Sequence, residues 1–169
     1  MLKYRYAYNL TNKIVDVIGL QKQNIDKNEV FKCIGCSNIL IPVLGQKRQK
    51  HFRHKISINC SPETYLHKLA KTRFYEIYTN CLQQNEPFLI TINQKKICNY
   101  YESGFLFSCD LGKSLEDFDL TKYFREIRLE EKEDSFIPDL LLISNKGDKL
   151  FIEIAVTHRS SQEKIDSGY

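Results

Sequence analysis

The sequence contains no long apolar run, and this absence argues against one class of protein at the outset. No stretch approaches the ~20 consecutive apolar residues that a helix needs to cross a bilayer, so we expect neither a membrane-spanning helix nor a membrane partner. The first residues, MLKYRYAYNLTNK, alternate aromatic and polar side chains and lack the uninterrupted apolar segment of a signal peptide. The resulting expectation is a cytoplasmic location.

A strong charge of one sign, internal repeats and low-complexity tracts are also missing. The chain has 169 residues and a formal net charge of +4, which permits a nucleic-acid partner without requiring one. Hydrophobic residues make up 42% of the chain, enough for a real core, and 27% of the residues are charged, as in soluble globular proteins. The length predicts one domain, or one domain with a small appendage.

Short strands are predicted in the first third of the chain. Alternating aromatic and β-branched residues indicate strands over 4–8 and 14–18, with a turn near Asn9–Asn12, and a third strand over 30–33. The segment 38–44 is apolar, but Pro42 within it predicts an edge strand or a loop, because proline cannot donate to a strand ladder.

One long helix is predicted after Cys60. Ser61 is a suitable N-cap, and Pro62 suits the first helical position. Apolar residues then recur at helical spacing and predict a buried face made of Leu66, Leu69, Ala70, Phe74, Ile77 and Cys81.

The second half of the chain is predicted to be mainly strands. They fall over 87–92, 123–130, 136–144 and 149–158, and residues 145–148 supply a turn between the last two. The stretch around Cys98 and Cys109 is predicted to be irregular, and a short helix is predicted to start at Ser160 or Ser161.

A metal site is the strongest chemical signal in the sequence. The segment CIGC supplies Cys33 and Cys36, and HFRHKISINC supplies His51, His54 and Cys60. Two residues between cysteines allow a tight turn to aim both thiolates at one ion, and a second pair some twenty residues later can complete a tetrahedral zinc site. We expect a structural zinc held by Cys33, Cys36, His54 and Cys60, with His51 as the alternative fourth ligand. The competing interpretation is that the cysteines are simply buried and the histidines solvated.

A basic segment lies between these ligands. It places Lys47, Arg48, Lys50 and Arg53 around Phe52. Cations of this kind could contact phosphates while the aromatic ring stacks on a base. The same pattern also suits a solvated hairpin tip.

Two acids stand in apolar surroundings near the end of the chain. Asp139 follows Pro138, and Glu153 lies within FIEIAV. Burying an unpaired carboxylate costs several kcal/mol or more. Because strands joined by a four-residue turn run antiparallel, Asp139 and Glu153 are predicted to approach each other and to hold a magnesium or manganese ion, which would activate water for phosphodiester cleavage.

The order of these segments resembles a known family. FKCIGC, HFRHK, ETYLHKLAK, IPDLLL and FIEIAVTH together resemble the competence protein CoiA-like group of the PD-(D/E)XK nuclease superfamily, from about residue 30 to residue 169. The resemblance implies a helix, three antiparallel strands, a second helix and a last strand, with magnesium held by Asp139 and Glu153. The chain ends where the resemblance expects that last strand.

The family signature also expects a lysine two residues after the glutamate, where this chain has Ala155. The superfamily is known to move this lysine to a neighbouring helix, so Lys164 is the first substitute and Lys71 its rival. Glu63, His67 and Lys71 form one stripe along the long helix, which in the family flanks the active site, although an exposed polar stripe has the same pattern. Glu130 is a further candidate ligand, and Thr157 and His158 are candidates for reaching the phosphate.

These observations predict an α/β protein with a restriction-endonuclease-like core over 61–169 and a β-rich zinc-binding region over 1–60. The function expected is a magnesium-dependent nuclease acting on nucleic acid, DNA in the first place. The alternative is a catalytically inactive nuclease-like fold that binds DNA or a protein partner, which Ala155 favours. A purely structural zinc domain would leave Glu153 unexplained.

Overall fold

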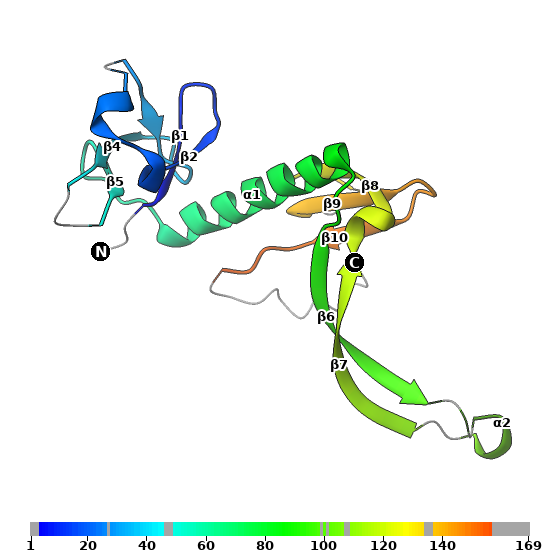
Figure 1. Ribbon diagram of the computed structural model, residues 1–169. Coiled ribbons are helices and arrows are strands. Elements are labelled where there is room, and N and C mark those ends of the chain that lie inside the picture. The colour runs from blue at the N-terminus through cyan, green and yellow to red at the C-terminus, as the bar shows by residue number, and fades with distance from the viewer. Residues whose placement is uncertain are drawn as a thin grey trace. The chain divides into compact units, whose positions relative to one another are not determined.

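The computed structural model describes residues 4–26, 28–45, 49–98, 100, 102–106, 109–133 and 137–156. It is a mixed α/β structure with small antiparallel sheets and one long helix in this part of the chain (Figure 1). The chain divides into two compact units, the first of Met1–Phe74 with Glu153–Tyr169 and the second of Tyr75–Ile152. These units differ from the predicted division at residue 60. Among the described residues no helix is both long and apolar enough to cross a membrane.

The first unit contains a five-stranded antiparallel sheet with the strand order β2-β1-β3-β4-β5. Its strands are β1 (Tyr6–Tyr8), β2 (Ile14–Asp16), β3 (Phe31–Lys32), β4 (Ile39–Val43) and β5 (His51–His54). The predicted hairpin between β1 and β2 is confirmed, and Asn12 in its turn has a φ of 56°. The predicted strand over 14–18 is shorter than expected, since the 3-10 turn η1 (Val17–Gly19) follows Asp16 directly.

The sheet of the first unit curls back on itself. Tyr4, just before β1, bridges Phe52 in β5, and the Phe52 N–H donates to the Tyr4 carbonyl at 2.6 Å. This curvature encloses a small core in which every side chain is at most 2% exposed, formed by Ala7, Val17, Phe31, Cys33, Ile34, Leu40, Phe52 and Tyr65.

Strand β4 is an inner strand of this sheet, so its predicted position at an edge is wrong. It pairs with β3 through Leu40 and Ile39 and with β5 along Leu40–Val43. Pro42 lies in the half that extends past β3, opposite Phe52 of β5. Proline is tolerated there because that side of β4 has no β3 carbonyl awaiting its missing N–H.

The long helix α1 (Pro62–Gln84) begins where the sequence predicts. The Ser61 side chain accepts a hydrogen bond from the Thr64 N–H at 3.2 Å, as an N-cap does. The predicted buried face is wrong in part: Leu66 is 39% exposed and Ile77 is 45% exposed, while Tyr65 and Tyr78 are the buried aromatic residues. The reason is that α1 contributes its first turns to the core of one unit and its last turns to that of the other.

The second unit holds a three-stranded antiparallel sheet in the order β10-β9-β8. Its strands are β8 (Phe124–Leu129), β9 (Leu140–Ser144) and β10 (Lys149–Ile152), preceded by the 3-10 turn η3 (Leu120–Lys122). The turn between β9 and β10 is as predicted, and Gly147 in it has a φ of 88°, which glycine adopts without strain. Leu140, Leu141 and Leu142 are fully buried, and the Tyr78 hydroxyl donates to the Phe124 carbonyl at 3.0 Å.

A long β-hairpin precedes this sheet, and the prediction of an irregular stretch here is wrong. Strands β6 (Leu89–Cys98) and β7 (Cys109–Asp119) pair along almost their whole length, with the short helix α2 (Glu102–Phe105) between them (Figure 1). Most positions on both strands are exposed, so the sequence carries little of the alternation that marks a half-buried strand. Cross-strand ion pairs join them instead, Lys95 to Asp110 at 2.9 Å and Lys96 to Glu116 at 3.1 Å.

Strand β10 is shorter than predicted, because it ends at Ile152 and not at His158. Glu153 therefore follows the strand and does not lie within it. The helix predicted from Ser160 or Ser161 lies outside the described residues.

Candidate metal centre

Four of the predicted metal ligands lie together in the first unit. Cys33 and Cys36 come from the turn between β3 and β4, His54 ends β5, and Cys60 precedes α1. One ligand atom from each lies within 4.8 Å of all the others, so the cluster could hold a metal ion such as zinc. Among the described residues it is the one group of three or more His, Cys, Asp or Glu side chains whose ligand atoms lie close enough to share a metal ion.

Hydrogen bonds fix the turn that carries the first two ligands. The Ser37 N–H donates to the Cys33 carbonyl and the Cys33 N–H donates to the Asn38 carbonyl, both at 2.8 Å. Gly35 within the turn lies against α1, where an added Cβ would come within 3.1 Å of the Tyr65 Cα. A larger residue at 35 would therefore push the turn and its two cysteines away from the helix.

The separations between ligand atoms agree with a tetrahedral zinc site. Zinc–sulfur bonds of about 2.3 Å and zinc–nitrogen bonds of about 2.0–2.1 Å place two sulfurs about 3.8 Å apart, and a sulfur and a nitrogen about 3.6 Å apart. The Cys33 and Cys60 sulfurs are 3.8 Å apart, and the Cys36 sulfur is 3.3 Å from His54 Nε2. The donor set thus fits zinc in its chemistry, and these two separations are close to those of a zinc site.

The local electrostatics already favour one thiolate. Burial alone would raise the pKa of Cys36, but hydrogen bonds from the Asn38 side chain and backbone, with those from His54 and Cys60, outweigh it and lower the pKa to about 6. Burial raises the pKa of Cys33 to about 12. A divalent cation between them would favour the thiolate form of both.

Tyr4 and Tyr65 pack beside the metal cluster and connect the elements that carry its ligands. The Tyr4 ring packs edge-on against both His54 and Tyr65, with centroids 4.9 Å and 4.8 Å apart. The Tyr65 hydroxyl bonds to the Tyr6 backbone, donating to its carbonyl at 2.9 Å and accepting from its N–H at 3.0 Å. These contacts attach the start of α1, and with it Cys60, to the sheet.

His51, the alternative fourth ligand, is not a member of this cluster. Its Nδ1 lies 3.0 Å from the Gln49 carbonyl. His51 and His54 are three residues apart on one strand, so their side chains point to opposite faces, and they would not naturally meet at one ion.

The basic segment is only partly exposed. Phe52 is 1% exposed and packs against Phe31 in the core, which contradicts its predicted role in stacking on a base. The Lys50 ammonium donates to the carbonyls of Ile18 at 3.0 Å and Leu20 at 2.6 Å. Arg53 is exposed. Lys47, Arg48 and His158 lie outside the described residues.

A second feature of the first unit is a pocket along the helix. It has a volume of about 360 Å³ and is lined by Glu63, Thr64, His67, Lys68 and Lys71 of α1 and by Ile154, Ala155 and Val156. The predicted stripe of Glu63, His67 and Lys71 therefore faces the segment that directly follows Glu153. Lys71 is only 7% exposed, so its side chain is within the structure and not on the solvated face of the helix.

The two predicted magnesium ligands are each half-buried. The Glu153 Oε1 atom is shielded from solvent. Asp139 directly precedes β9, and its carbonyl accepts from the Glu130 N–H at 3.2 Å, which extends the β8–β9 ladder. Glu130 itself is exposed, and Lys164 and Thr157 lie outside the described residues.

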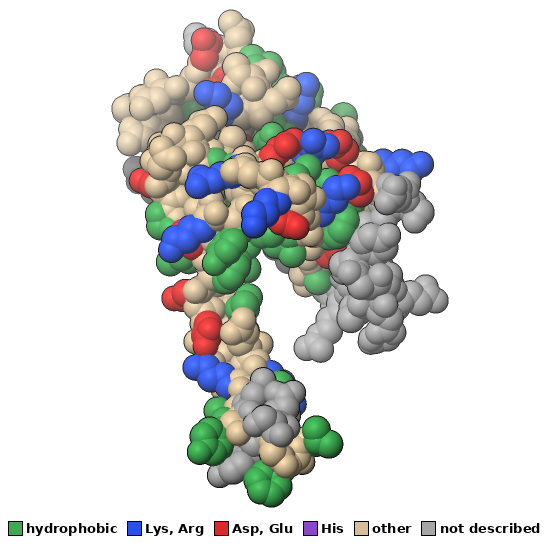
Figure 2. All heavy atoms as spheres, turned by 90° about the vertical axis from the view of Figure 1, so that its right-hand side faces the viewer, with side chains coloured by type: hydrophobic (Ala, Val, Ile, Leu, Met, Phe, Trp, Pro, Cys, Tyr) green, Lys and Arg blue, Asp and Glu red, His purple; other side chains and the backbone are tan. Residues whose placement is uncertain are grey.

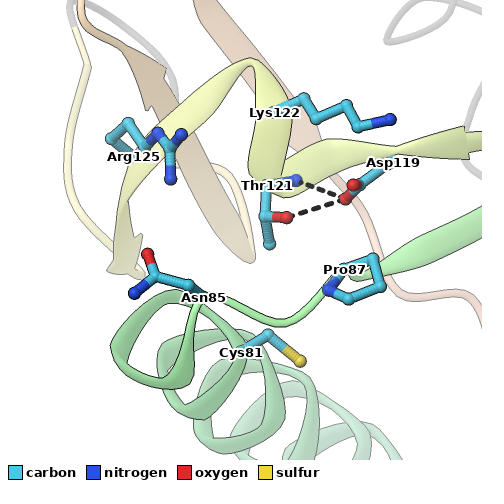
Figure 3. Close-up of a pocket in the computed structure, with 7 residues that line it drawn as sticks. All are labelled: Cys81, Asn85, Pro87, Asp119, Thr121, Lys122 and Arg125. Atoms are coloured by element: carbon cyan, nitrogen blue, oxygen red, sulfur yellow. Dashed lines mark hydrogen bonds between the residues drawn. The ribbon is translucent and has the colours of Figure 1, made fainter.

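The second unit has a pocket that the sequence did not indicate. It has a volume of about 400 Å³ and is lined by Cys81, Asn85, Pro87, Asp119, Thr121, Lys122 and Arg125 (Figure 3). The Asp119 carboxylate accepts from the Thr121 hydroxyl at 2.7 Å and from the Thr121 and Phe88 N–H groups at 3.1 Å. The hydrogen bond from the Thr121 hydroxyl has the largest effect in lowering the pKa of the Asp119 carboxyl, and the two backbone hydrogen bonds lower it further. The acid thus serves to cap η3, a role that the sequence Asp-Leu-Thr could have suggested.

No family model, no curated protein and no solved structure matches this chain.

Proposed function

We propose that this chain is a magnesium- or manganese-dependent nuclease that cleaves phosphodiester bonds in DNA, built on a restriction-endonuclease-like core and stabilised by a structural zinc ion. The observation that carries the proposal is the pocket in which Glu63, His67 and Lys71 face the segment after Glu153. These three side chains lie on one helix and line the same cavity, and the family resemblance implies that a helix of this kind flanks the active site.

Asp139 and Glu153 would supply the metal ligands. Strands β9 and β10 pair in a register that ends at Leu140 opposite Ile152. The two acids lie just outside this pairing, Asp139 directly before β9 and Glu153 directly after β10. Carboxylate oxygens are the donors that magnesium prefers. A bound magnesium would lower the pKa of a water molecule and offset charge on the scissile phosphate.

Lys71 would take the place of the lysine that the family signature expects at position 155. Ala155 and Lys71 line the same pocket, so the ammonium group can act in the space that a lysine side chain from 155 would enter. A cation that is largely shielded from water stabilises a developing negative charge more strongly than an exposed one. This argument favours Lys71 over Lys164, the substitute first chosen from the sequence.

The zinc ion would have no part in catalysis. All four positions of a tetrahedral site would be filled by Cys33, Cys36, His54 and Cys60, which leaves no open position for water or substrate. Its role would be to hold the β3–β4 turn, the end of β5 and the start of α1 together. The exposed Arg53, with Lys47 and Arg48, would contact the phosphate backbone.

The alternative is a catalytically inactive nuclease-like fold that binds DNA or a protein partner. Ala155 in the signature position is the observation that favours it. The two proposals differ in one measurable property, which is metal-dependent cleavage.

Incubation of the purified chain with supercoiled circular DNA tests the proposal. Nicking or linearisation is expected with magnesium or manganese and not with a chelator that removes them. Asp139→Asn and Glu153→Gln should each abolish cleavage while DNA binding is kept, and Lys122→Ala, which removes a lysine of the second unit, is the matched control that should cleave normally. A wild-type chain that binds DNA but cleaves with neither metal would support the inactive fold instead, and cleavage by the double acid variant would end the nuclease proposal.

A further inference from the structure

Two cysteines outside the metal cluster stand opposite each other in the long hairpin. Cys98 is the last residue of β6 and Cys109 the first of β7, and the two are partners in the strand register. Both are free and half-buried, and neither belongs to the cluster formed by Cys33, Cys36, His54 and Cys60.

Their position meets the geometric requirement for a cross-link. Residues directly opposite in antiparallel strands have Cα atoms about 4.5–5.5 Å apart, and disulfides span Cα separations of about 4.4–6.8 Å. Opposed residues also project their side chains to the same face of the hairpin. The bond can therefore form by side-chain rotation, without a change of register.

A cross-link at this position would stabilise the end of the hairpin. Two strands alone are marginally stable in water, and here most positions of β6 and β7 are exposed. The register also shifts between Lys95 and Ile97, just before the cysteine pair. Beyond the pair the connection carries Tyr100, Phe105 and Leu106, which are 79%, 77% and 95% exposed, and apolar side chains gather at this end of the hairpin (Figure 2).

We propose that Cys98 and Cys109 form a reversible disulfide that fixes the end of the hairpin, with a small-molecule disulfide such as oxidised glutathione as the oxidant. The thiolate of one cysteine attacks a sulfur of glutathione disulfide and expels one glutathione thiolate. The thiolate of the second cysteine then attacks the mixed disulfide at the protein sulfur and expels the other. The protein loses two electrons and two protons, and two molecules of reduced glutathione receive them. The inference does not depend on the proposed nuclease activity.

The chain provides a direct assay for this bond. Trypsin cleavage after Lys96 and Lys113 releases the peptide 97–113, which contains Cys98 and Cys109 and no other cysteine. After equilibration of the zinc-loaded protein with reduced and oxidised glutathione, this peptide should be lighter by two hydrogen atoms and should resist alkylation. A further cut after Glu102 should leave two fragments that separate only on reduction.

A synthetic peptide of residues 97–113 is the matched control, because it has the same loop without the strands that align its ends. The folded chain should form the disulfide with an equilibrium constant at least about tenfold larger than the peptide. Cys81→Ser should leave the result unchanged, and Cys98→Ser should leave Cys109 open to alkylation. Equal constants for chain and peptide, separate glutathione adducts on the two cysteines, or disulfide-linked dimers of the chain would each overturn the proposal.

Discussion

Replacing Cys60 by serine should remove zinc from the first unit and lower its stability sharply. The Cys60 sulfur is 3.8 Å from that of Cys33, and Cys33 is fully buried in the core beside Phe31 and Phe52. The metal site therefore shares Cys33 with the core. Loss of the metal would loosen the packing around Cys33 as well as the metal site itself.

The size of the effect follows from ligand linkage. A metal bound only by the folded state stabilises it by about 4.1 kcal/mol when its free concentration is about 1,000 times its dissociation constant. For a domain of 60–100 residues each kcal/mol shifts the Tm by about 4–8 °C. Cys60→Ser should thus lower the Tm of the first unit by at least about 15 °C, and the thiol of Cys36 should no longer be protected from alkylation.

Elemental analysis and thermal unfolding check this prediction, with His51→Ala as the matched control. His51 is the other candidate ligand, and its ring lies against the Gln49 carbonyl. Its replacement should keep one zinc per chain and should shift the Tm by only a few degrees, since a net hydrogen bond contributes about 1 kcal/mol. Zinc retained in Cys60→Ser but lost from His51→Ala would refute the ligand assignment.

Phe52→Ala should destabilise the first unit by about 3–5 kcal/mol, and Phe52→Leu by clearly less, because the ring fills the core and does not meet DNA; chemical denaturation measures both. Arg53→Ala combined with Lys47→Ala and Arg48→Ala should weaken DNA binding and flatten its dependence on salt, because with fewer phosphate contacts fewer counterions are released on binding. If the slope of log affinity against log salt concentration is unchanged in binding titrations, this segment is only a solvated loop. Asp16→Asn should lower the Tm by a few degrees at neutral pH, since Arg5 holds the pKa of that carboxyl below its usual value through bonds of 2.6–3.1 Å. A carboxyl whose pKa is lowered in the folded state stabilises that state at pH values above its unfolded pKa, and this stabilisation is lost as the pH falls. Wild type and variant should therefore have the same Tm at about pH 2.

The metal ligands could be predicted from the sequence because their geometry is mostly local. A tight turn brings Cys33 and Cys36 together whatever the rest of the chain does. The choice between His51 and His54 also has a local answer, since β5 places them on opposite faces. The same alternation could have shown that Phe52 points away from Arg53 and towards the core, had the cationic neighbours not suggested a surface role.

The buried face of α1 could not be predicted from one apolar stripe. Tyr65 and Tyr78 are thirteen residues apart, which at about 100° per residue places them on different sides of the helix. Each serves a different core, and that arrangement depends on contacts distant in sequence. Only the start of the β6–β7 hairpin was predicted, as the strand over 87–92. The rest escaped prediction because its stabilising pairs, such as Lys95 with Asp110, lie on exposed positions.

The cleavage rate of Lys71→Ala, alone and combined with Ala155→Lys, tests the central claim most directly. The claim is that the pocket lined by both residues is the active site and that Lys71 supplies its cation. With saturating magnesium and circular DNA, and with zinc content and Tm as checks on folding, Lys71→Ala should lose most of the cleavage rate, and the added lysine at 155 should restore a substantial part of it. Full activity in Lys71→Ala would contradict the account.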